Sequence, residues 1–381
     1  MKKNTLLLLM LISFLICCKT GEKPEIKPDI REEKTTPVDV LFQQVSRLDL
    51  PDLVYPYILA TDDELYVYGY LLNKKETSIK KFDNHLQLVF EKKFPWGQGP
   101  GDLGGGTFFS KSGDTFYAFD NIQQRINVFN KNLEFERFVS TKQTYQSPLL
   151  CEDGKNFIAG IHIMASDNLK HFSGAEIVAV SFPGLDKKLL HKFPMVLKVE
   201  TKNGQKFSYA GNYHQYDYFA KGENVYILDM KEYILYRFHL DGTLIHSVRV
   251  DVEKVPVPDS KREQWLKEHY GEYQRSPVKF VFTDYVLPAS WMVPLGKGFA
   301  VIRRYGYSLE CNGMVEADYF NYNLEMLGKI KIPCFDRMFA LGLYVIPRTA
   351  AYRNGYLYLV SKKTDKNDDE LYILEKWQVQ E

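Results

Sequence analysis

Hydrophobic positions in residues 38–381 occur in short runs, rich in aromatic and β-branched side chains, that end at Asp, Asn or Gly. The clearest unit has apolar runs at 225–228, 235–238 and 245–248, with turn residues between them. Almost no stretch shows the longer period of an amphipathic helix. Short apolar runs bounded by turn residues are typical of β-strands joined by hairpins. The pattern therefore predicts an all-β domain over these residues.

Such a unit recurs along the domain, and each copy has an aromatic residue in its first strand. The six aromatic positions are Tyr66, Tyr117, Phe157, Tyr226, Phe299 and Tyr358. Intervals of 40 to 73 residues separate them, which indicates loop insertions of different lengths. Units of three or four short strands cannot bury their faces alone, but units stacked around an axis bury them against one another. The sequence predicts a six-bladed β-propeller, or one with seven blades if a long interval hides another unit.

Two further elements belong to the predicted domain. A strand near 45–48 is expected to close the ring by pairing with the blade that ends the chain. A helical insertion is predicted over 259–275, because Ser260 and Glu263 form a capping box and large side chains follow at four-residue spacing. This helix either covers the disc or forms a lid or docking element over the central funnel.

The first 18 residues have the parts of an export signal. Lys2 and Lys3 precede an uncharged run whose centre is almost entirely Leu, Ile, Met and Phe. The run is too short for a permanent membrane-spanning helix but suits the apolar region of a signal peptide. Its end, Leu-Ile-Cys-Cys, resembles the lipobox of bacterial lipoproteins, with Cys17 where Gly, Ala or Ser is usual. The resemblance implies that Cys18 is lipidated. The alternative is a secreted protein with an unmodified signal.

Residues 19–37 contain ten charged residues and three prolines but no aromatic residue. A segment of this composition cannot bury enough apolar surface to offset the entropy of ordering the chain. The segment is therefore predicted to be a disordered tether. The expected organisation is a signal peptide at 1–18, this tether at 19–37, and a propeller domain at 38–381.

The charge balance argues against one class of partner. Across 381 residues, 49 Lys and Arg face 48 Asp and Glu, which gives a formal net charge of +1. No strong field is available to attract nucleic acid, so nucleic acid is not expected as a partner. The domain also contains Cys151, Cys311 and Cys334, an odd number that allows at most one disulfide. Buried free thiols are the favoured interpretation.

Few sequence motifs indicate a catalytic, nucleotide-binding or metal-binding site. Residues 99–104 match the glycine spacing of a nucleotide-binding loop, but β-rich sequence follows where such a loop must open a helix. These glycines are predicted to form a tight connection between blades that needs positive φ. Residues 365–370 begin like a calcium loop but lack Gly at the sixth position, so a solvated hairpin tip is predicted.

The eight histidines are scattered, and none lies at metal-ligand spacing from another His or Cys. His162 and His171 flank Asp167 in the third unit, and residues of several blades can still meet on the axis of a propeller. No metal site and no cofactor are predicted.

Two clusters, at 212–218 and 303–307, contain more aromatic, amide and Arg side chains than blade packing requires. Stacking rings and forked hydrogen bonds are what carbohydrate and peptide surfaces use. The candidate ligand-binding residues, including two lone Trp residues, are Tyr213, His214, Gln215, Trp291, Arg303, Arg304 and Trp96. The alternative is that these side chains pack the cores and rims of blades.

Recurring motifs also resemble those of a known family. A strand with Tyr-x-hydrophobic-Asp, followed by a strand that ends in Phe-Asn or Phe-Asp, repeats along the domain, and Phe-Pro-Trp-Gly-Gln-Gly-Pro-Gly-Asp stands at 94–102. Together these features resemble the TolB-like six-bladed β-propeller lipoproteins of Gram-negative bacteria over nearly all of the domain. The resemblance implies a propeller at the cell envelope, lipid-anchored to a bacterial membrane such as the outer membrane, on its periplasmic or surface face. It implies no chemistry, because the members are largely uncharacterised.

The function expected from the sequence is a non-catalytic, membrane-anchored propeller that binds an envelope protein or glycan. The alternative is a propeller enzyme, such as a hydrolase, lactonase or lyase, with a metal or paired carboxylates in the central funnel. Three or more His, Asp and Glu side chains in one axial pocket would favour the enzyme. Fold analogy alone cannot choose between the two.

Overall fold

The computed structural model describes most of the domain and a short piece of the segment before it. The described residues are 28–31, 38–164, 172–194, 198–201, 206–208, 216–256, 258–260, 278–279, 285, 287–303, 313–333, 349–364 and 370–381. Of the predicted helix at 259–275, only residues 259 and 260 are among them. Within the described part of the chain, no helix is long and apolar enough to cross a membrane.

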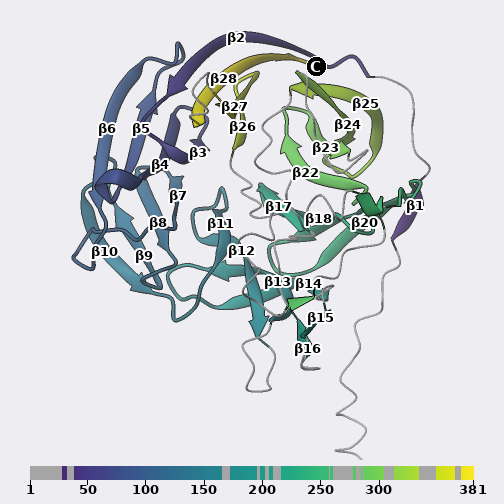
Figure 1. Ribbon diagram of the computed structural model, residues 1–381, viewed down its shortest axis with the longest axis horizontal. Coiled ribbons are helices and arrows are strands. Elements are labelled where there is room, and N and C mark those ends of the chain that lie inside the picture. Colours follow the sequence, from purple (N-terminus) through teal and green to yellow (C-terminus); the bar gives the residue numbers. More distant parts are fainter. Residues whose placement is uncertain are drawn as a thin grey trace, which may run out of the picture.

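The strands form six four-stranded antiparallel sheets arranged as a ring, which confirms the six-bladed propeller (Figure 1). Blades 1 to 3 consist of β3 (Val54–Ala60), β4 (Leu65–Leu71), β5 (Glu76–Phe82) and β6 (Leu88–Pro95); β7 (Thr107–Ser112), β8 (Thr115–Asp120), β9 (Arg125–Phe129) and β10 (Phe135–Ser140); and β11 (Gln146–Leu150), β12 (Asn156–Met164), β13 (Phe172–Ser181) and β14 (Lys187–Pro194).

Blades 4 to 6 consist of β17 (Tyr216–Lys221), β18 (Asn224–Asp229), β19 (Ile234–His239) and β20 (Leu244–Val250); β22 (Ala289–Pro294), β23 (Gly298–Arg303), β24 (Met314–Asn321) and β25 (Met326–Pro333); and β26 (Ala350–Arg353), β27 (Tyr356–Thr364), β28 (Glu370–Gln380) and β2 (Leu41–Leu50). β1 (Asp29–Arg31) adds a fifth strand to blade 4, beside β20. Outside the blades lie the 3₁₀ turn η1 (Leu72–Lys74) and a small sheet of β15 (Lys198–Thr201), β16 (Lys206–Ser208) and β21 (Val278–Lys279).

The aromatic repeat marks the second strand of every blade, because each of the six positions found in the sequence lies there. Ring closure also follows the prediction. β2 pairs antiparallel with β28, with Leu48 opposite Leu374, and so supplies the outermost strand of the last blade. The two ends of the domain are therefore joined in one sheet.

The hairpins between third and fourth strands explain the Phe-Asn and Phe-Asp motif. In blade 2, Oδ1 of Asn130 accepts hydrogen bonds from the backbone N–H groups of Asn132 and Glu134. Asn321 does the same in blade 5 for Asn323 and Glu325. In both turns the Leu before the Glu has a positive φ and a buried side chain. Burial of this Leu offsets the backbone strain of the left-handed conformation.

The hydrophobic core lies between neighbouring blades rather than inside one. Tyr66 of blade 1 meets Phe116 of blade 2 edge to face, with ring centroids 5.2 Å apart. Phe119 of blade 2 meets Phe157 of blade 3 in the same way at 5.0 Å. Such aromatic pairs stabilise the fold by more than the burial of their apolar surface alone. The aromatic content of the chain is therefore largely used to pack one blade on the next.

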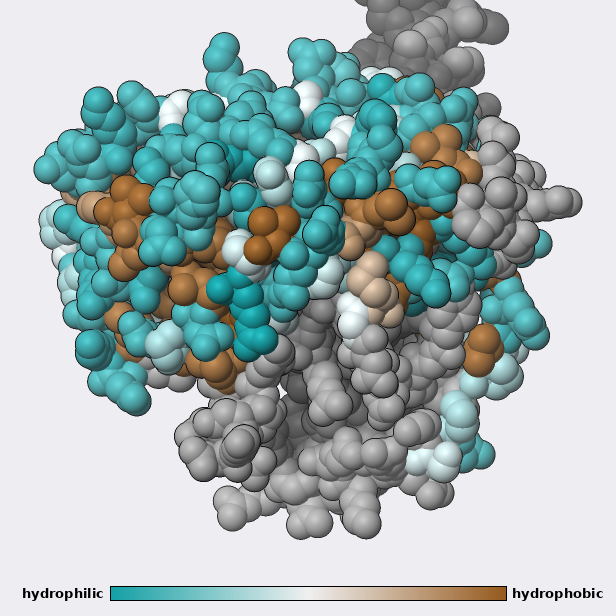
Figure 2. All heavy atoms as spheres, turned by 90° about the horizontal axis from the view of Figure 1, so that it is seen from above, coloured by the Kyte–Doolittle hydropathy of each residue, from teal (hydrophilic) through white to brown (hydrophobic). Residues whose placement is uncertain are grey.

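The outer strands carry the exposed apolar side chains, among them Leu41, Val45, Leu88, Val89 and Leu327. Figure 2, which views the ring from the side where β2 lies in Figure 1, shows apolar groups set among hydrophilic residues. Scattered exposure of this kind is ordinary for a soluble surface.

A charged joint connects blades 1 and 2. Oε1 of Glu64 lies 2.7 Å from Nζ of Lys81 on β5, and Oε2 lies 2.7 Å from Nζ of Lys111 on β7. Partial burial raises the pKa of Glu64, but the hydrogen bonds and charges of Lys111 and Lys81 outweigh it and lower the pKa to about 2. The carboxylate is therefore stabilised in its charged form by groups from both blades.

Replacing Glu64 with Gln is expected to lower the free energy of unfolding by about 1 kcal/mol at pH 7. Because the pKa of Glu64 falls from 4.5 to about 2 on folding, this contribution is present above pH 4.5 and lost as the pH falls towards 2. Urea unfolding of both proteins across this range measures it, with Glu136→Gln on exposed β10 as the control. A difference that stays constant with pH would contradict the assignment.

Candidate functional site

A pocket with a volume of about 800 Å³ lies where the innermost strands of all six blades come together. Its walls are formed by β3, β7, β11, β17, β22 and β26, so it lies on the axis of the ring. The hairpins that follow these strands also line it, at Asp62, Gly113, Glu152, Gly296 and Gly355. Closure of the ring therefore creates a cavity to which every blade contributes.

The walls combine hydroxyl groups with small and aromatic side chains. Thr61, Ser110, Ser112 and Ser147 come from blades 1 to 3. Blades 4 to 6 contribute aromatic residues, including Tyr218, Trp291 and Tyr352, and several alanines. The pocket is neither strongly apolar nor dominated by one sign of charge.

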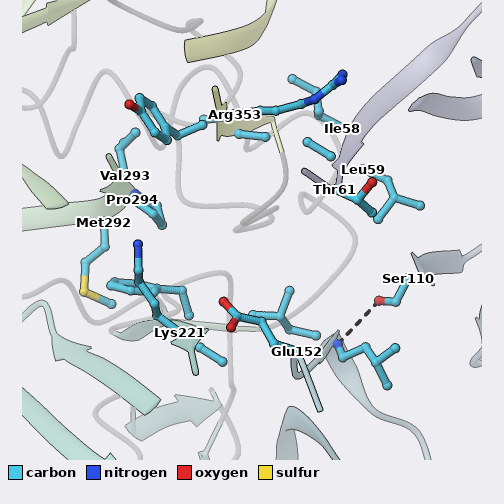
Figure 3. A pocket seen from close by; sticks show the side chains of 18 of the residues that line it. Ile58, Leu59, Thr61, Ser110, Glu152, Lys221, Met292, Val293, Pro294 and Arg353 are labelled. Carbon is cyan, nitrogen blue, oxygen red and sulfur yellow. Dashed lines mark hydrogen bonds between the residues drawn. The ribbon is translucent and has the colours of Figure 1, made fainter. Parts of the chain in front are cut away.

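Two opposite charges point into the pocket from neighbouring blades. Figure 3 shows Glu152, from the hairpin after β11, and Lys221, at the end of β17, directed towards the cavity. Nζ of Lys221 also lies 4.2 Å from the ring centroid of Tyr322. Arg353 instead runs along the wall, where its Nε donates to the backbone oxygen of Asp62. Glu152 and Lys221 are thus two charged groups of opposite sign that a ligand entering here would meet, beside the lining residues Asp62 and Lys111.

A buried carboxyl group links the innermost strands of blades 4 and 5. Oδ2 of Asp217 on β17 accepts the backbone N–H of Met292 on β22 at 2.7 Å, and Oδ1 accepts that of Tyr218 at 2.8 Å. Asp217 is only 4% exposed. Burial raises its pKa to about 7, although both backbone hydrogen bonds oppose the rise. Asp217 therefore holds two blades together at the wall of the pocket and titrates near neutral pH.

The seven candidate ligand-binding residues have different places in the structure. Of the three candidates that the structure describes, Trp291 alone lines the axial pocket, and it is largely buried in β22. The cluster at 212–218 reaches the pocket through its last residues, since Asp217 and Tyr218 line it. Outside the described residues lie Tyr213, His214, Gln215, Arg304 and the proposed lipidation site Cys18.

Arg303 and Trp96 are engaged in contacts between strands, away from the axial pocket. Nη1 of Arg303 lies 3.0 Å from Oδ2 of Asp318, and the guanidinium lies over the ring of Tyr233. Nε1 of Trp96 donates to Oγ1 of Thr77 at 3.1 Å. These contacts fit the alternative interpretation, in which such side chains pack blade cores and rims.

The glycine-rich loop at 97–104 is a structural joint between blades 1 and 2. Nη2 of Arg125 donates to the backbone oxygens of Gly99 and Asp102. Only Gly101 in this loop has a positive φ, whereas a Cβ on Gly97 or Gly99 would lie within 3 Å of the Asp102 carboxylate. The expectation that these glycines serve positive φ is therefore correct for one of them, and close approach explains the others. The strand β7, not a helix, follows the loop.

Metal-ligating groups are dispersed in the described part of the chain, where no three His, Cys, Asp or Glu residues are placed to hold an ion. Asp167, His171 and most of the calcium-like stretch at 365–370 lie outside this part. Cys151 is a free, buried thiol whose pKa is raised by burial. Cys311 and Cys334 lie outside the described residues.

Comparison with known proteins supports the fold. No family model and no curated protein matches the chain. A solved structure of a DUF4221 family member from Bacteroides vulgatus matches with a TM-score of 0.53 and 12% identity, over 90% of this chain and 98% of that chain. A Bacteroides fragilis protein thought to be exported matches with a TM-score of 0.51 and 13% identity, over 93% and 100%. At such low identity the likeness shows the shared architecture alone, and the TolB-like assignment stays a prediction.

Sequence reasoning missed Glu152 and Lys221 as pocket residues, and it included Asp217 within the cluster at 212–218 without naming it as a candidate. Glu152 and Lys221 are ordinary charged residues of hairpins, and only the ring geometry brings them together. Asp217 had a weak signal, because it stands between two tyrosines in a strand that is apolar or aromatic up to its final residue, Lys221. The neighbouring tyrosines indicate that Asp217 lies in a buried strand. They do not indicate that its carboxylate accepts a hydrogen bond from Met292 in blade 5.

Replacing Asp217 with Asn is expected to remove a pH dependence of stability. Because the pKa of Asp217 is about 7 when folded and 3.8 in its ordinary state, the folded chain retains a proton that the unfolded chain has lost. The free energy of unfolding of the wild type therefore falls as the pH rises from about 4 to 7. Urea unfolding at several pH values should show a shallower fall in the variant; equal slopes would contradict the assignment.

Proposed function

We propose that the chain is an exported, lipid-anchored envelope protein whose propeller binds a protein or glycan partner through its axial pocket without catalysing a reaction. The axial pocket carries this proposal. Its volume lies within the range of about 300–1,000 Å³ that is common for ligand sites. A site built from all six blades is also held in place by the whole ring.

The lining supports a neutral, polar ligand. Hydroxyl groups and aromatic rings are the groups that bind the polar edges and apolar faces of sugars, and they serve peptides equally well. The lining holds acidic and basic residues in equal number, and Glu152 and Lys221 point inwards, so the pocket has no strong preference for a charged ligand. Oligosaccharides and extended peptide segments of the envelope both fit this description.

Two structural contacts support binding rather than catalysis. Both oxygens of Asp217 accept backbone hydrogen bonds, and Arg353 is bound to the backbone of Asp62. These groups already have structural partners, and so does Lys111, which pairs with Glu64. Glu152 and Lys221 are the charged side chains that Figure 3 shows directed into the cavity. Recognition needs no more than such a pair on a shaped surface.

One observation favours the enzyme as the second candidate. Asp217 lines the pocket, and its pKa of about 7 suits a group that exchanges protons near neutral pH. In that case the propeller would be a hydrolase, lactonase or lyase with Asp217 as its acid or base. Loss of turnover in an Asp217→Asn variant that still folds is the result that would favour this candidate.

The envelope location rests on the N-terminal sequence. A basic start, an apolar run and the lipobox-like ending at Cys18 support export and lipidation. The similar structure from Bacteroides fragilis is itself thought to be an exported protein. The domain would then face the periplasm or the cell surface.

Binding can be tested on the lipid-free domain with the melting temperature as readout. Neutral oligosaccharides, such as maltohexaose and chitohexaose, and peptide fragments of envelope proteins serve as probes. A probe at one hundred times its dissociation constant should stabilise the fold by about 2.7 kcal/mol. Glu152→Ala and Lys221→Ala should each lower the affinity for the probe at least tenfold and so reduce the stabilisation that the probe gives.

The matched control is Glu223→Ala, which removes a highly exposed carboxylate from the hairpin between β17 and β18, outside the pocket lining. It should leave binding unchanged. If every probe fails, or if all three variants respond alike, the axial pocket is not the binding site.

A further inference from the structure

The segment before the domain is attached to the propeller at an unexpected place. Asp29, Ile30 and Arg31 of β1 pair in parallel with Val248, Arg249 and Val250 of β20. Oδ2 of Asp29 also lies 3.8 Å from Nε2 of His246 on the same strand. The sequence predicts a disordered tether at 19–37, which includes residues 29–31. The strand β1 was therefore not expected from the sequence.

The chain then passes from blade 4 to blade 6. The backbone N–H of Val38 donates to the oxygen of Lys329 on β25 of blade 5 at 2.9 Å. The side chain of Val40 is buried in the core that includes residues of blade 5, and β2 begins directly afterwards at Leu41. The described parts of the segment thus contact the outermost strands of blades 4 and 5 in turn, and the chain then enters β2, the outermost strand of blade 6 (Figure 1).

Pairing with β20 has a clear physical basis. β20 is the outermost strand of blade 4, and an outermost strand presents unpaired N–H and C=O groups along its edge. β1 satisfies part of this edge by strand addition, the mode by which extended peptides bind to sheets. The pairing therefore covers an edge and attaches the N-terminal segment to one particular blade.

We propose that β1 makes blade 4 the membrane-proximal side of the propeller. This inference rests on the proposed lipid anchor at Cys18. Ten residues separate Cys18 from Asp29, so the two cannot be more than about 40 Å apart, at 3.3–3.6 Å per residue. Without β1, the first described attachment would be Val38 on blade 5, 20 residues after Cys18, and the limit would be about 70 Å. The docked strand therefore shortens the reach by nearly half and moves the point of attachment from blade 5 to blade 4.

Blade 4 is expected to lie closer to the membrane than blade 1. Blade 1 lies across the ring from blade 4 (Figure 1), so its distance from the lipid surface should be greater. The full-length lipidated protein is placed in vesicles that contain a headgroup-labelled acceptor lipid. A donor dye on a clickable amino acid is introduced at Glu223 in blade 4 or at His85 in blade 1. Energy transfer should be at least twofold more efficient from position 223.

Proline substitutions test whether β1 is the cause. The double variant Asp29→Pro/Ile30→Pro removes a backbone N–H whichever of the two residues faces β20. It should bring the ratio of the two transfer efficiencies close to one. Glu33→Pro/Lys34→Pro is the matched control and should leave the ratio unchanged. Equal transfer in the wild type, or a ratio that the Asp29→Pro/Ile30→Pro variant does not alter, would overturn the proposal.

Two measurements separate this inference from the lipid anchor itself. Membrane sedimentation of the wild type, and its loss in Cys18→Ala, reports the anchor alone. Hydrogen exchange in the full chain in detergent reports β1 alone, because amides of 247–250 that face β1 should exchange at least tenfold faster in the Asp29→Pro/Ile30→Pro variant. Unchanged exchange would show that β1 does not dock, whatever the state of the anchor.

Discussion

Pairing between β2 and β28 is the constraint on which the rest of the structure depends. It joins residues 41–50 to residues 372–380 in one sheet, across almost the whole length of the domain. A ring without this pairing would expose two unpaired edges and separate blade 6 from blade 1. The axial pocket would then lack a continuous wall. Both the stability of the fold and the existence of the site therefore follow from one contact between sequence-distant strands.

The second requirement is that neighbouring blades pack on one another, and this explains the unusual chemistry of several residues. Aromatic rings fill the space between blades 1, 2 and 3. Polar contacts between neighbouring blades fix the position of one blade relative to the next. Arg125 holds the glycine-rich loop, Glu64 joins two lysines, and Asp217 joins two inner strands. Polar groups of this kind are tolerated at blade contacts because they form hydrogen bonds or ion pairs across them. They specify how blades meet rather than what the protein binds.

The sequence predicted the repeating part of the fold well. Turn residues and the aromatic of each second strand recur in every blade, and local propensity and burial agree there. The innermost strands were harder to predict from the sequence, because strands such as β7 and β26 are short and partly polar. The site was hardest of all. Glu152 and Lys221 lie in different blades, and no spacing in the sequence shows that they face the same cavity.

The same reasoning explains why two sequence-based candidates turned out to have structural partners. Trp96 and Arg303 stand out in the sequence as a lone aromatic and a basic residue, yet both satisfy contacts between strands. In a propeller rich in aromatic residues, such side chains are needed wherever blades meet. The strand β1 was missed for the opposite reason, since its sequence is typical of a disordered segment and only the free edge of β20 gives it a partner.

Photo-crosslinking in cells tests the central claim, that the axial pocket binds an envelope component, most directly. Benzoylphenylalanine would replace Tyr352, which lines the pocket, or Tyr356, four residues away and outside the lining. A discrete crosslinked adduct, to a protein or a glycan, is expected at position 352, and little at position 356. Absence of an adduct at 352, or equal adducts at both positions, would contradict the claim.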